Sequence, residues 1–474
     1  MKAPIITIII SAIVLSIISI APFLDNYTIF LCYSIVISIL TLFIFKQKLA
    51  NYKGLDFSFL FLCGYIIRVV IPGIVMPIQL LSGESFIFLN DRNIVDDALF
   101  STAAWMNIYY MLFYCALRKV SKGYTIDNII LPYLNKYKIS YISISLFIVG
   151  FSYKIFTHDI PAGLITSSVN ELFGQFTTLA LILQVFNASL KYTKVKQDIL
   201  IILVVAEMLR AVFFDFYKSA IMMPFVLYLL YCFMASKHQG KKLLTIKNIL
   251  SVVVFFSLIS NVIYPFMTIK RVEAGFRATV GGGVATKSYS NIDILNRVIS
   301  GDLIKEEKNS TFDRFNALPA NAYFYKESVS KNWHTTEVLK NNIELLVPKF
   351  INPNKHGSQA GLMAYAYAQY GSLSFFKNSL SNNYIGQFAS SYLIGGEIAV
   401  IIFALLNGIM FGAYYNYMMK NISNLFALYC LARIFLSALF SIEEIHDGGA
   451  LRIGCMLVYM VIVALTNNFL KLRS

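Results

Sequence analysis

The chain has 474 residues, is 57% hydrophobic, and carries 40 Lys and Arg against 25 Asp and Glu, a net charge of +15. Only 14% of its residues are charged, against about 25% in soluble domains, and its mean hydropathy is +0.65, which excludes an ordinary soluble enzyme. The excess of positive charge does not indicate nucleic-acid binding. The basic residues gather in short connections between apolar runs, where they are expected to determine the membrane topology and to contact anionic lipid.

Apolar runs recur along the chain, each close to the length of about 20 residues that a helix needs to cross a membrane. Lipid offers the backbone no hydrogen-bond partners, so each run is predicted to be a helix. The sequence thus predicts an all-α polytopic integral membrane protein with about 12 transmembrane helices. The expected spans are 4–24, 28–45, 57–77, 98–117, 139–156, 171–190, 199–214, 219–235, 249–267, 388–416, 421–440 and 451–469.

Every second connection between these spans is rich in lysine and arginine. The intervening short connections hold few of these residues. By the positive-inside rule the basic side is cytoplasmic, so both termini are expected in the cytoplasm. The basic residues that set this orientation are Lys46, Lys48, Lys53, Arg118, Lys119, Lys122, Lys136, Lys138, Lys191, Lys194, Lys196, Lys237, Lys241, Lys242, Lys247 and Lys420.

Three regions follow from the spans. Residues 1–267 form a membrane domain with spans one to nine, 268–387 a large, mainly helical external loop, and 388–474 a membrane domain with the last three spans. A loop of this size is expected to hold chemistry or recognition. No internal repeat is seen in the sequence. This argues against a transporter fold, because many transporters are built from two structurally related halves.

No metal or cofactor is expected. The six cysteines lie in predicted spans without a disulfide or zinc spacing, and the five histidines are too scattered for a metal site. The first span is followed by no small-residue cleavage site and is expected to act as an anchor.

Ionisable residues within spans are costly and are therefore candidates for function. They are Arg68, Lys154, Glu207, Arg210, Asp215, Lys218, Glu397, Arg433 and Arg452. Lys154 lies near the end of its span and is expected to snorkel toward the interface. Arg68 precedes Pro72, where a kink is expected. Arg68 either has a functional role or pairs with an internal carboxylate or a free backbone carbonyl.

The segment 207–218 concentrates charge between two short spans. Arg210 follows Glu207 by three residues on one helix face, which allows an internal ion pair. Alternatively Arg210 serves an anion site together with Lys218, which opens the next helix, where the helix dipole favours negative charge. The residues leave both alternatives open.

Further cationic and acid–base candidates lie in the external segments. Arg271 and Arg277 follow span nine, and an arginine fork suits a phosphate group; solvated surface arginines are the alternative. Arg314, Lys349 and Lys355 are similar candidates. The last external loop, 442–452, holds Glu443, Glu444, His446 and Asp447 with Arg452 close behind, a density that suits acid–base chemistry or an ordinary polar loop.

The layout and the block Leu345–Lys355 (LLVPKFINPNK) resemble bacterial oligosaccharide repeat-unit polymerases of the Wzy type, which build O-antigen and capsule. Pro348, Lys349, Phe350, Pro353 and Lys355 match that family's proline-rich block loosely. His356 stands where the family has a final proline, and Lys349 where it has arginine, the residue type that binds phosphate bidentately. The small-residue entry to span ten (YIGQFASSYLIGGEIAV) is also similar to the family.

The resemblance implies a glycosyltransferase of the bacterial inner membrane that needs no cofactor. Its partners would be undecaprenyl-diphosphate-linked glycan as donor and acceptor, membrane lipid, a chain-length regulator and a flippase, with no nucleic acid. Arg210, Lys218, Arg271 and Arg277 would neutralise the leaving diphosphate, and Glu444, His446 or Asp215 would take the acceptor proton.

Two other functions fit the same layout. They are a flippase for lipid-linked oligosaccharide and an O-antigen ligase, which differs from the polymerase in its acceptor. Aromatic residues of the external loop (Trp333, Tyr323 and Tyr325) would stack on sugars or pack a core of the loop.

Overall fold

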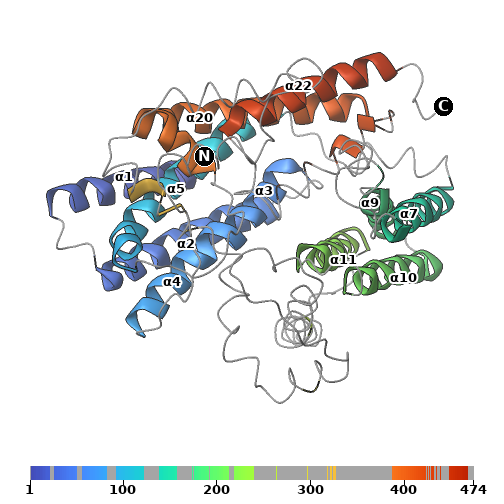
Figure 1. Ribbon diagram of the computed structural model, residues 1–474, viewed down its shortest axis with the longest axis horizontal. Helices are drawn as coiled ribbons and strands as arrows, with labels where there is room; N and C mark the ends of the chain where they lie inside the picture. Colours follow the sequence, from blue (N-terminus) through green and yellow to red (C-terminus); the bar gives the residue numbers. More distant parts are fainter. Residues whose placement is uncertain are drawn as a thin grey trace, which may run out of the picture. The chain divides into compact units, whose positions relative to one another are not determined.

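The computed structural model describes residues 2–21, 26–50, 56–82, 92–121, 138–156, 176–191, 193–212, 218–239, 387–422 and 448–467, with single positions at 173, 263 and 296 and within 318–326 and 424–438. These residues are almost entirely helical and contain no β-strand (Figure 1). Within them, five helical stretches are long and apolar enough to cross a membrane: Ala3–Ile20, Tyr27–Ala50, Phe57–Leu81, Ile139–Phe156 and Gln387–Lys420. This confirms the expected helical fold with several helices that could span a membrane, while the count of about 12 spans stays a prediction.

The chain divides into two compact units, Met1–Tyr124 with Phe312–Ser474, and Thr125–Thr311. The predicted external region 268–387 is described only at 296, within 318–326 and at Gln387. The helices of the first unit are α1 (Lys2–Ile20), α2 (Tyr27–Ala50), α3 (Phe57–Tyr65), η2 (Ile66–Val70), α4 (Ile71–Leu81), α5 (Arg92–Val120), α20 (Gln387–Lys420) and α22 (Gly448–Thr466).

The core of the first unit is the contact between α5 and α20. A Cβ atom added at Gly408 would lie 2.5 Å from the carbonyl oxygen of Phe113, and one at Gly412 would lie 2.9 Å from Cβ of Val120. The two glycines are four residues apart and form a G-x-x-x-G stripe, which lets helix backbones approach closely in an apolar environment. Phe411 between them stacks on Phe57 of α3, so the glycine stripe also organises the aromatic core.

Helix α20 is broken at Gly395 and Gly396. Gly396 has φ 63° and ψ −147°, a conformation open essentially only to glycine. The hydroxyl of Tyr109 donates to Gln387 at 2.9 Å and accepts from Asn407 at 2.9 Å, so the segments before and after the break lie against the same point of α5. The segment Gln387–Leu393, buried at every position, therefore folds back on the long helix that follows. The span expected over 388–416 is thus present as an apolar helical stretch but is interrupted at this glycine pair.

The third candidate span is one continuous helical rod made of α3, η2 and α4. Asp56 caps its start by accepting the backbone N–H of Phe59, and Lys48 of α2 pairs with Asp56 at 2.5 Å. The middle segment Ile66–Val70 is π-helical and carries Arg68, which is buried. Such π segments occur often at functional sites because they widen the helix and reposition side chains.

The second unit is a bundle of α7 (Ile139–Phe156), α9 (Phe176–Leu190), α10 (Lys194–Arg210) and α11 (Lys218–Gln239), coloured green in Figure 1. Helix α9 packs against the other three, and its residues from Thr177 to Ser189 are all buried. Gly150 lies where α7 meets α9, since a Cβ there would stand 2.7 Å from the backbone nitrogen of Thr177.

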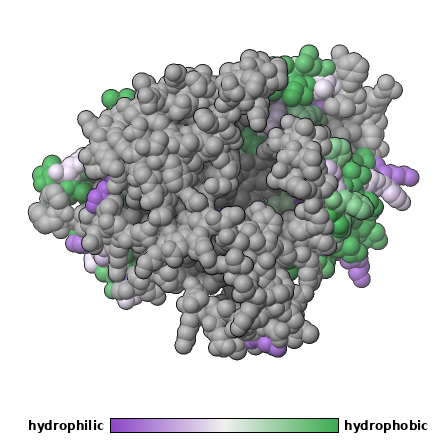
Figure 2. Space-filling view, in the orientation of Figure 1, coloured by the Kyte–Doolittle hydropathy of each residue, from purple (hydrophilic) through white to green (hydrophobic). Residues whose placement is uncertain are grey.

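Large apolar side chains cover the outer faces of both units, as expected of helices in contact with lipid. Figure 2 shows such hydrophobic residues in green among the described parts of the surface. They include Ile9 and Ile13 of α1, Ile39 and Leu42 of α2, Ile148 of α7, Ile202 of α10 and Ile398 of α20, each more than half exposed. This arrangement, with apolar residues outside and polar residues within, supports placement in a membrane.

Candidate anion-binding site

A buried charged cluster, which we call the Glu207 cluster, joins the ends of α7, α9 and α10. Oε1 of Glu207 accepts hydrogen bonds from Nζ of Lys154 at 2.6 Å, from the Thr177 hydroxyl at 3.3 Å and from an Nη of Arg210 at 3.0 Å. Oε2 accepts from Nε of Arg210 at 3.0 Å. Donors from three helices thus converge on one carboxylate oxygen.

Local helix geometry explains the convergence. Arg210 lies one turn after Glu207 in α10 and grips both carboxylate oxygens as a fork. Lys154 occupies the last turn of α7, and Thr177 is the second residue of α9. Because the close approach at Gly150 brings α7 against the start of α9, the Lys154 ammonium also reaches the Thr177 hydroxyl, at 2.6 Å.

The cluster is buried unequally. The side chains of Glu207 and Arg210 are each 1% exposed, whereas that of Lys154 is 19% exposed. Lys154 is therefore the member that reaches the surface of the bundle. Burial of ions in an apolar setting is favourable only where each has close partners, and the fork between Arg210 and Glu207 supplies them.

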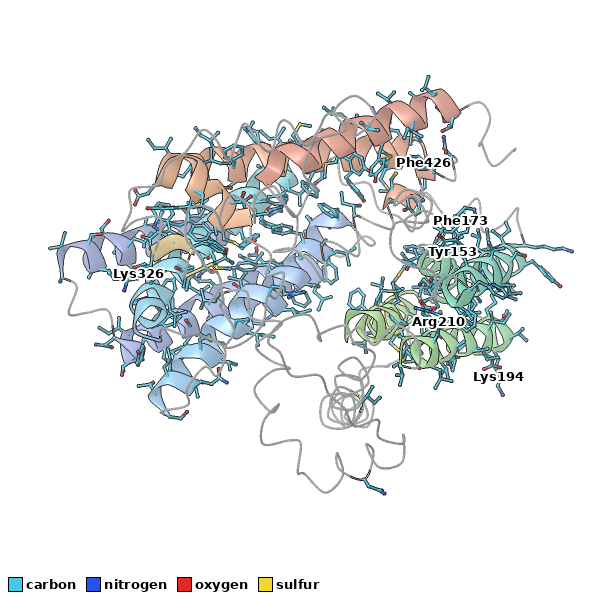
Figure 3. The ribbon with its side chains drawn as sticks, in the orientation of Figure 1. Tyr153, Phe173, Lys194, Arg210, Lys326 and Phe426 are labelled. Atoms are coloured by element: carbon cyan, nitrogen blue, oxygen red, sulfur yellow. The ribbon has the colours of Figure 1, made fainter. Side chains whose placement is uncertain are left out.

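Aromatic side chains lie beside the cluster. Tyr153 stacks on Phe173 with ring centroids 5.3 Å apart, and Phe173 packs on Phe176, the first residue of α9. Figure 3 labels Tyr153, Phe173 and Arg210 within the same bundle, with Lys194 at the other end of α10 from Arg210. Tyr153 precedes Lys154 in the chain, and Phe176 precedes Thr177.

The opposite end of the bundle is rich in lysine. Lys191 follows α9, Lys194 and Lys196 open α10, and Lys138 precedes α7 with its ammonium 5.7 Å from the centre of the Tyr141 ring. Partial burial and the charge of Lys191 lower the pKa of Lys196 below its ordinary value. Cations are crowded here, which distinguishes this end from the end that holds Glu207.

The structure confirms one of the two alternatives drawn for the 207–218 segment, namely the ion pair between Glu207 and Arg210. The ammonium of Lys154, which was expected to snorkel toward the interface, hydrogen-bonds to Glu207 and Thr177. Sequence reasoning missed Thr177, because a threonine opening a buried helix gives no signal without its neighbours.

Most other predicted site residues lie outside the described residues. These are Asp215, Arg271, Arg277, Arg314, Lys349, Lys355, Glu444 and His446. For two more only the backbone is described: Lys218 begins α11, and Arg452 lies in the first half of α22. The structure thus leaves the roles expected of these residues as predictions.

Two further polar networks lie inside the first unit. Ser11, Tyr33, Asn107 and Tyr65 form a buried hydrogen-bonded chain that links α1, α2, α5 and α3. The second is the Tyr109 contact with Gln387 and Asn407. In the described part of the 268–387 region, Tyr325 packs on Phe388 and Tyr392 of α20, with centroids 6.1 and 4.8 Å away. Among the described residues, no group of His, Cys, Asp and Glu is arranged to hold a metal ion.

Comparison of the chain with protein-family models, curated proteins and solved structures finds no match.

Proposed function

We propose that the protein is a polymerase that joins undecaprenyl-diphosphate-linked oligosaccharide units into surface polysaccharide at the outer face of the bacterial inner membrane. The proposal includes about 12 spans, cytoplasmic termini and an external region at 268–387. It rests on the resemblance of the layout and of Leu345–Lys355 to repeat-unit polymerases, and on the chemistry of the Glu207 cluster.

The observation that carries the proposal is the set of donors around Oε1 of Glu207. An ammonium, a hydroxyl and a guanidinium meet at a single anionic oxygen at one end of an apolar bundle. A lipid diphosphate combines a compact, strongly charged group with a hydrocarbon chain. Groups that can hold a carboxylate oxygen can hold a phosphoryl oxygen by the same charge-assisted bonds.

The distribution of lysines supports an outward-facing cluster. Lys138, Lys191, Lys194 and Lys196 lie at the end of the second unit opposite the Glu207 cluster. If that lysine-rich end is cytoplasmic, as the positive-inside rule requires, Lys154 and Arg210 lie toward the outer leaflet. Repeat units linked to lipid diphosphate would meet the enzyme at that leaflet.

The proposed reaction transfers a glycan between two lipid carriers. The acceptor hydroxyl attacks the anomeric carbon of the donor, the bond to the diphosphate oxygen breaks, and its electron pair leaves with undecaprenyl diphosphate. The hydroxyl proton passes to Glu444, His446 or Asp215. Cations stabilise the charge that develops on the diphosphate; the candidates are Lys154, Arg210, Lys218, Arg271, Arg277, Arg314, Lys349, Lys355 and Arg452.

A flippase is the second candidate function, and one observation favours it. Helix α20 is interrupted at Gly395 and Gly396, and discontinuous helices often form the substrate sites of transporters. An O-antigen ligase would use the same donor chemistry with a different acceptor.

Deleting the gene and examining the cell's glycans tests these functions against one another. A polymerase deletion leaves surface glycan of a single repeat unit, whereas a flippase deletion accumulates lipid-linked units in the cytoplasmic leaflet. A ligase deletion leaves long polymer on the lipid carrier. Either of the last two results would overturn the proposed polymerase.

A sharper test uses the purified protein in vesicles with lipid-linked repeat units. We expect a ladder of products from the wild type and from Lys194→Met, and short or no products from Lys154→Met. Lys194 is a suitable control because it is an exposed lysine in the same bundle, at the far end from Glu207.

A further inference from the structure

The Glu207 cluster contains two cations that differ in how firmly they are held. Arg210 binds both oxygens of Glu207 through two nitrogens, each at 3.0 Å, and its side chain is 1% exposed. Lys154 binds a single carboxylate oxygen, at 2.6 Å, and is 19% exposed. The lysine can therefore move away from Glu207 while Arg210 remains paired with the carboxylate.

We propose that the Glu207 cluster works by ion exchange: an incoming diphosphate takes Lys154 from Glu207, while Arg210 stays behind to neutralise the carboxylate. This inference rests on the proposed function and assigns the parts within its site. Of the candidates named above, Lys154 contacts the anion, whereas Arg210 is a positioning residue that stays paired with Glu207. Glu207 binds Lys154 when no anion is present.

Thr177 makes the exchange possible with little movement. Its hydroxyl accepts from the Lys154 ammonium at 2.6 Å and donates to Glu207 at 3.3 Å. When the lysine turns to an anion, the threonine keeps its bond to the carboxylate. Glu207 then still has Thr177 and the fork of Arg210, so no buried charge is left without a partner, which is the costly outcome for a buried ion.

The exchange predicts a specific pattern of binding. Lys154→Met removes the contact itself and should weaken diphosphate binding about tenfold or more, the value of one charge-assisted hydrogen bond. Arg210→Met should also weaken binding, because Glu207 then depends on Lys154 and retains it. Glu207→Gln should tighten binding, because an uncharged amide competes less well for the lysine.

The decisive variant is the double substitution Glu207→Gln with Arg210→Met. If Arg210 acts only by neutralising Glu207, removing both charges frees Lys154 again and restores binding to the wild-type level or tighter. If Arg210 touches the anion, the double variant lacks that contact and binds clearly more weakly than the single variant Glu207→Gln, whereas the two variants bind alike if Arg210 does not touch it. A role confined to stability would not produce this recovery.

Equilibrium binding to the detergent-solubilised full chain measures the pattern, with farnesyl diphosphate and inorganic pyrophosphate as probes. Tighter binding of the prenyl diphosphate identifies a lipid headgroup as the source of the anion, and equal binding identifies free diphosphate. Lys194→Met is the matched control, with wild-type affinity expected. Each variant is first checked by gel filtration and by its unfolding temperature.

The outcomes separate this inference from the proposed function. A wild-type protein that binds neither probe overturns both. A wild type that binds, with Lys154→Met unchanged or with no recovery in the double variant, overturns the ion exchange alone. Should Arg210→Met fail to fold, Lys154→Met placed in the double-variant background still decides whether Lys154 is the contact, since binding should then fall about tenfold.

Discussion

Gln387 and Asn407 hydrogen-bond to the same atom, the hydroxyl oxygen of Tyr109, each at 2.9 Å. A straight helix between them would hold the two residues about 30 Å apart at about 1.5 Å per residue. The shared contact therefore requires the chain to reverse between them, and it does so at Gly395 and Gly396. Tyr109 thus fastens the folded-back segment Gln387–Leu393 to the long part of α20.

Tyr109→Phe should destabilise the protein, because it leaves a buried carbonyl of Gln387 and a buried amide of Asn407 without this partner. The expected cost is about 1–3 kcal/mol for each group. Tyr114→Phe is the matched control. Tyr114 lies in the same helix and is 1% exposed against 0% for Tyr109, but its hydroxyl has no hydrogen-bond partner among the described residues. We expect that control to be neutral or stabilising, as measured by thermal unfolding in detergent. Equal losses in the two variants would contradict the fastening role of Tyr109.

Gly396→Ala should destabilise the reversal in α20. The residue has φ 63° and ψ −147°, a region where a Cβ atom is strained by about 1–3 kcal/mol. Gly395→Ala is the control, since φ −167° is extended backbone and the nearest atom to an added Cβ is the side-chain Cβ of Ala399, at 3.1 Å. We expect Gly396→Ala to lower the unfolding temperature more than Gly395→Ala does. The reverse order would show that the reversal does not depend on this backbone conformation.

Gly408→Ala should loosen the contact between α5 and α20. Its new methyl group would stand 2.5 Å from the Phe113 carbonyl oxygen, and relief of such a clash costs about 1–3 kcal/mol. Gly73→Ala provides the comparison, because its nearest neighbour would be Oγ of Ser34 at 3.6 Å, an ordinary contact. Folded yield and unfolding temperature should fall for Gly408→Ala and stay close to wild type for Gly73→Ala. A Gly408→Ala protein as stable as the wild type would rule out close packing through this glycine.

The proposed orientation of the second unit can be tested with single cysteines in a background free of the native ones. Lys194 lies at the lysine-rich end, and His158 follows the opposite end of α7 in the sequence. We expect a membrane-impermeant thiol reagent to label His158→Cys in intact cells and Lys194→Cys only after the membrane is opened. Labelling in the opposite sense would place the Glu207 cluster at the cytoplasmic face and remove the basis of the proposed function.

Contacts within one helix could be predicted from the sequence, whereas contacts between helices could not. The pair Glu207–Arg210 could be predicted because a spacing of three residues places both side chains on one helix face. Lys154 could not be assigned to it, since its distance from the carboxylate depends on how α7 packs on α9 and α10. Hydropathy located the span over 139–156 with the bounds that the structure has.

Interruptions of a helix were harder to predict than helices. The run 388–416 is predominantly apolar, so hydropathy joins two segments that the structure folds against each other. The Gly395–Gly396 pair was a usable signal, since paired glycines often mark turns. The residues of the π-helical segment Ile66–Val70 would suit an α-helix equally well, and only Pro72, two residues beyond it, indicated an irregularity in this helix.

The enclosure of α9 has a consequence for how the chain is made. Gln184 donates to the carbonyl oxygen of Lys196 and Asn187 to the hydroxyl of Ser140, so each amide is satisfied by a different neighbouring helix. Ser140 is synthesised before α9 and Lys196 after it. A nascent chain that has delivered α9 to the bilayer still lacks the partner of Gln184 until the ribosome has added α10. We therefore expect α9 to reach its final, fully hydrogen-bonded position only after α10 has been synthesised.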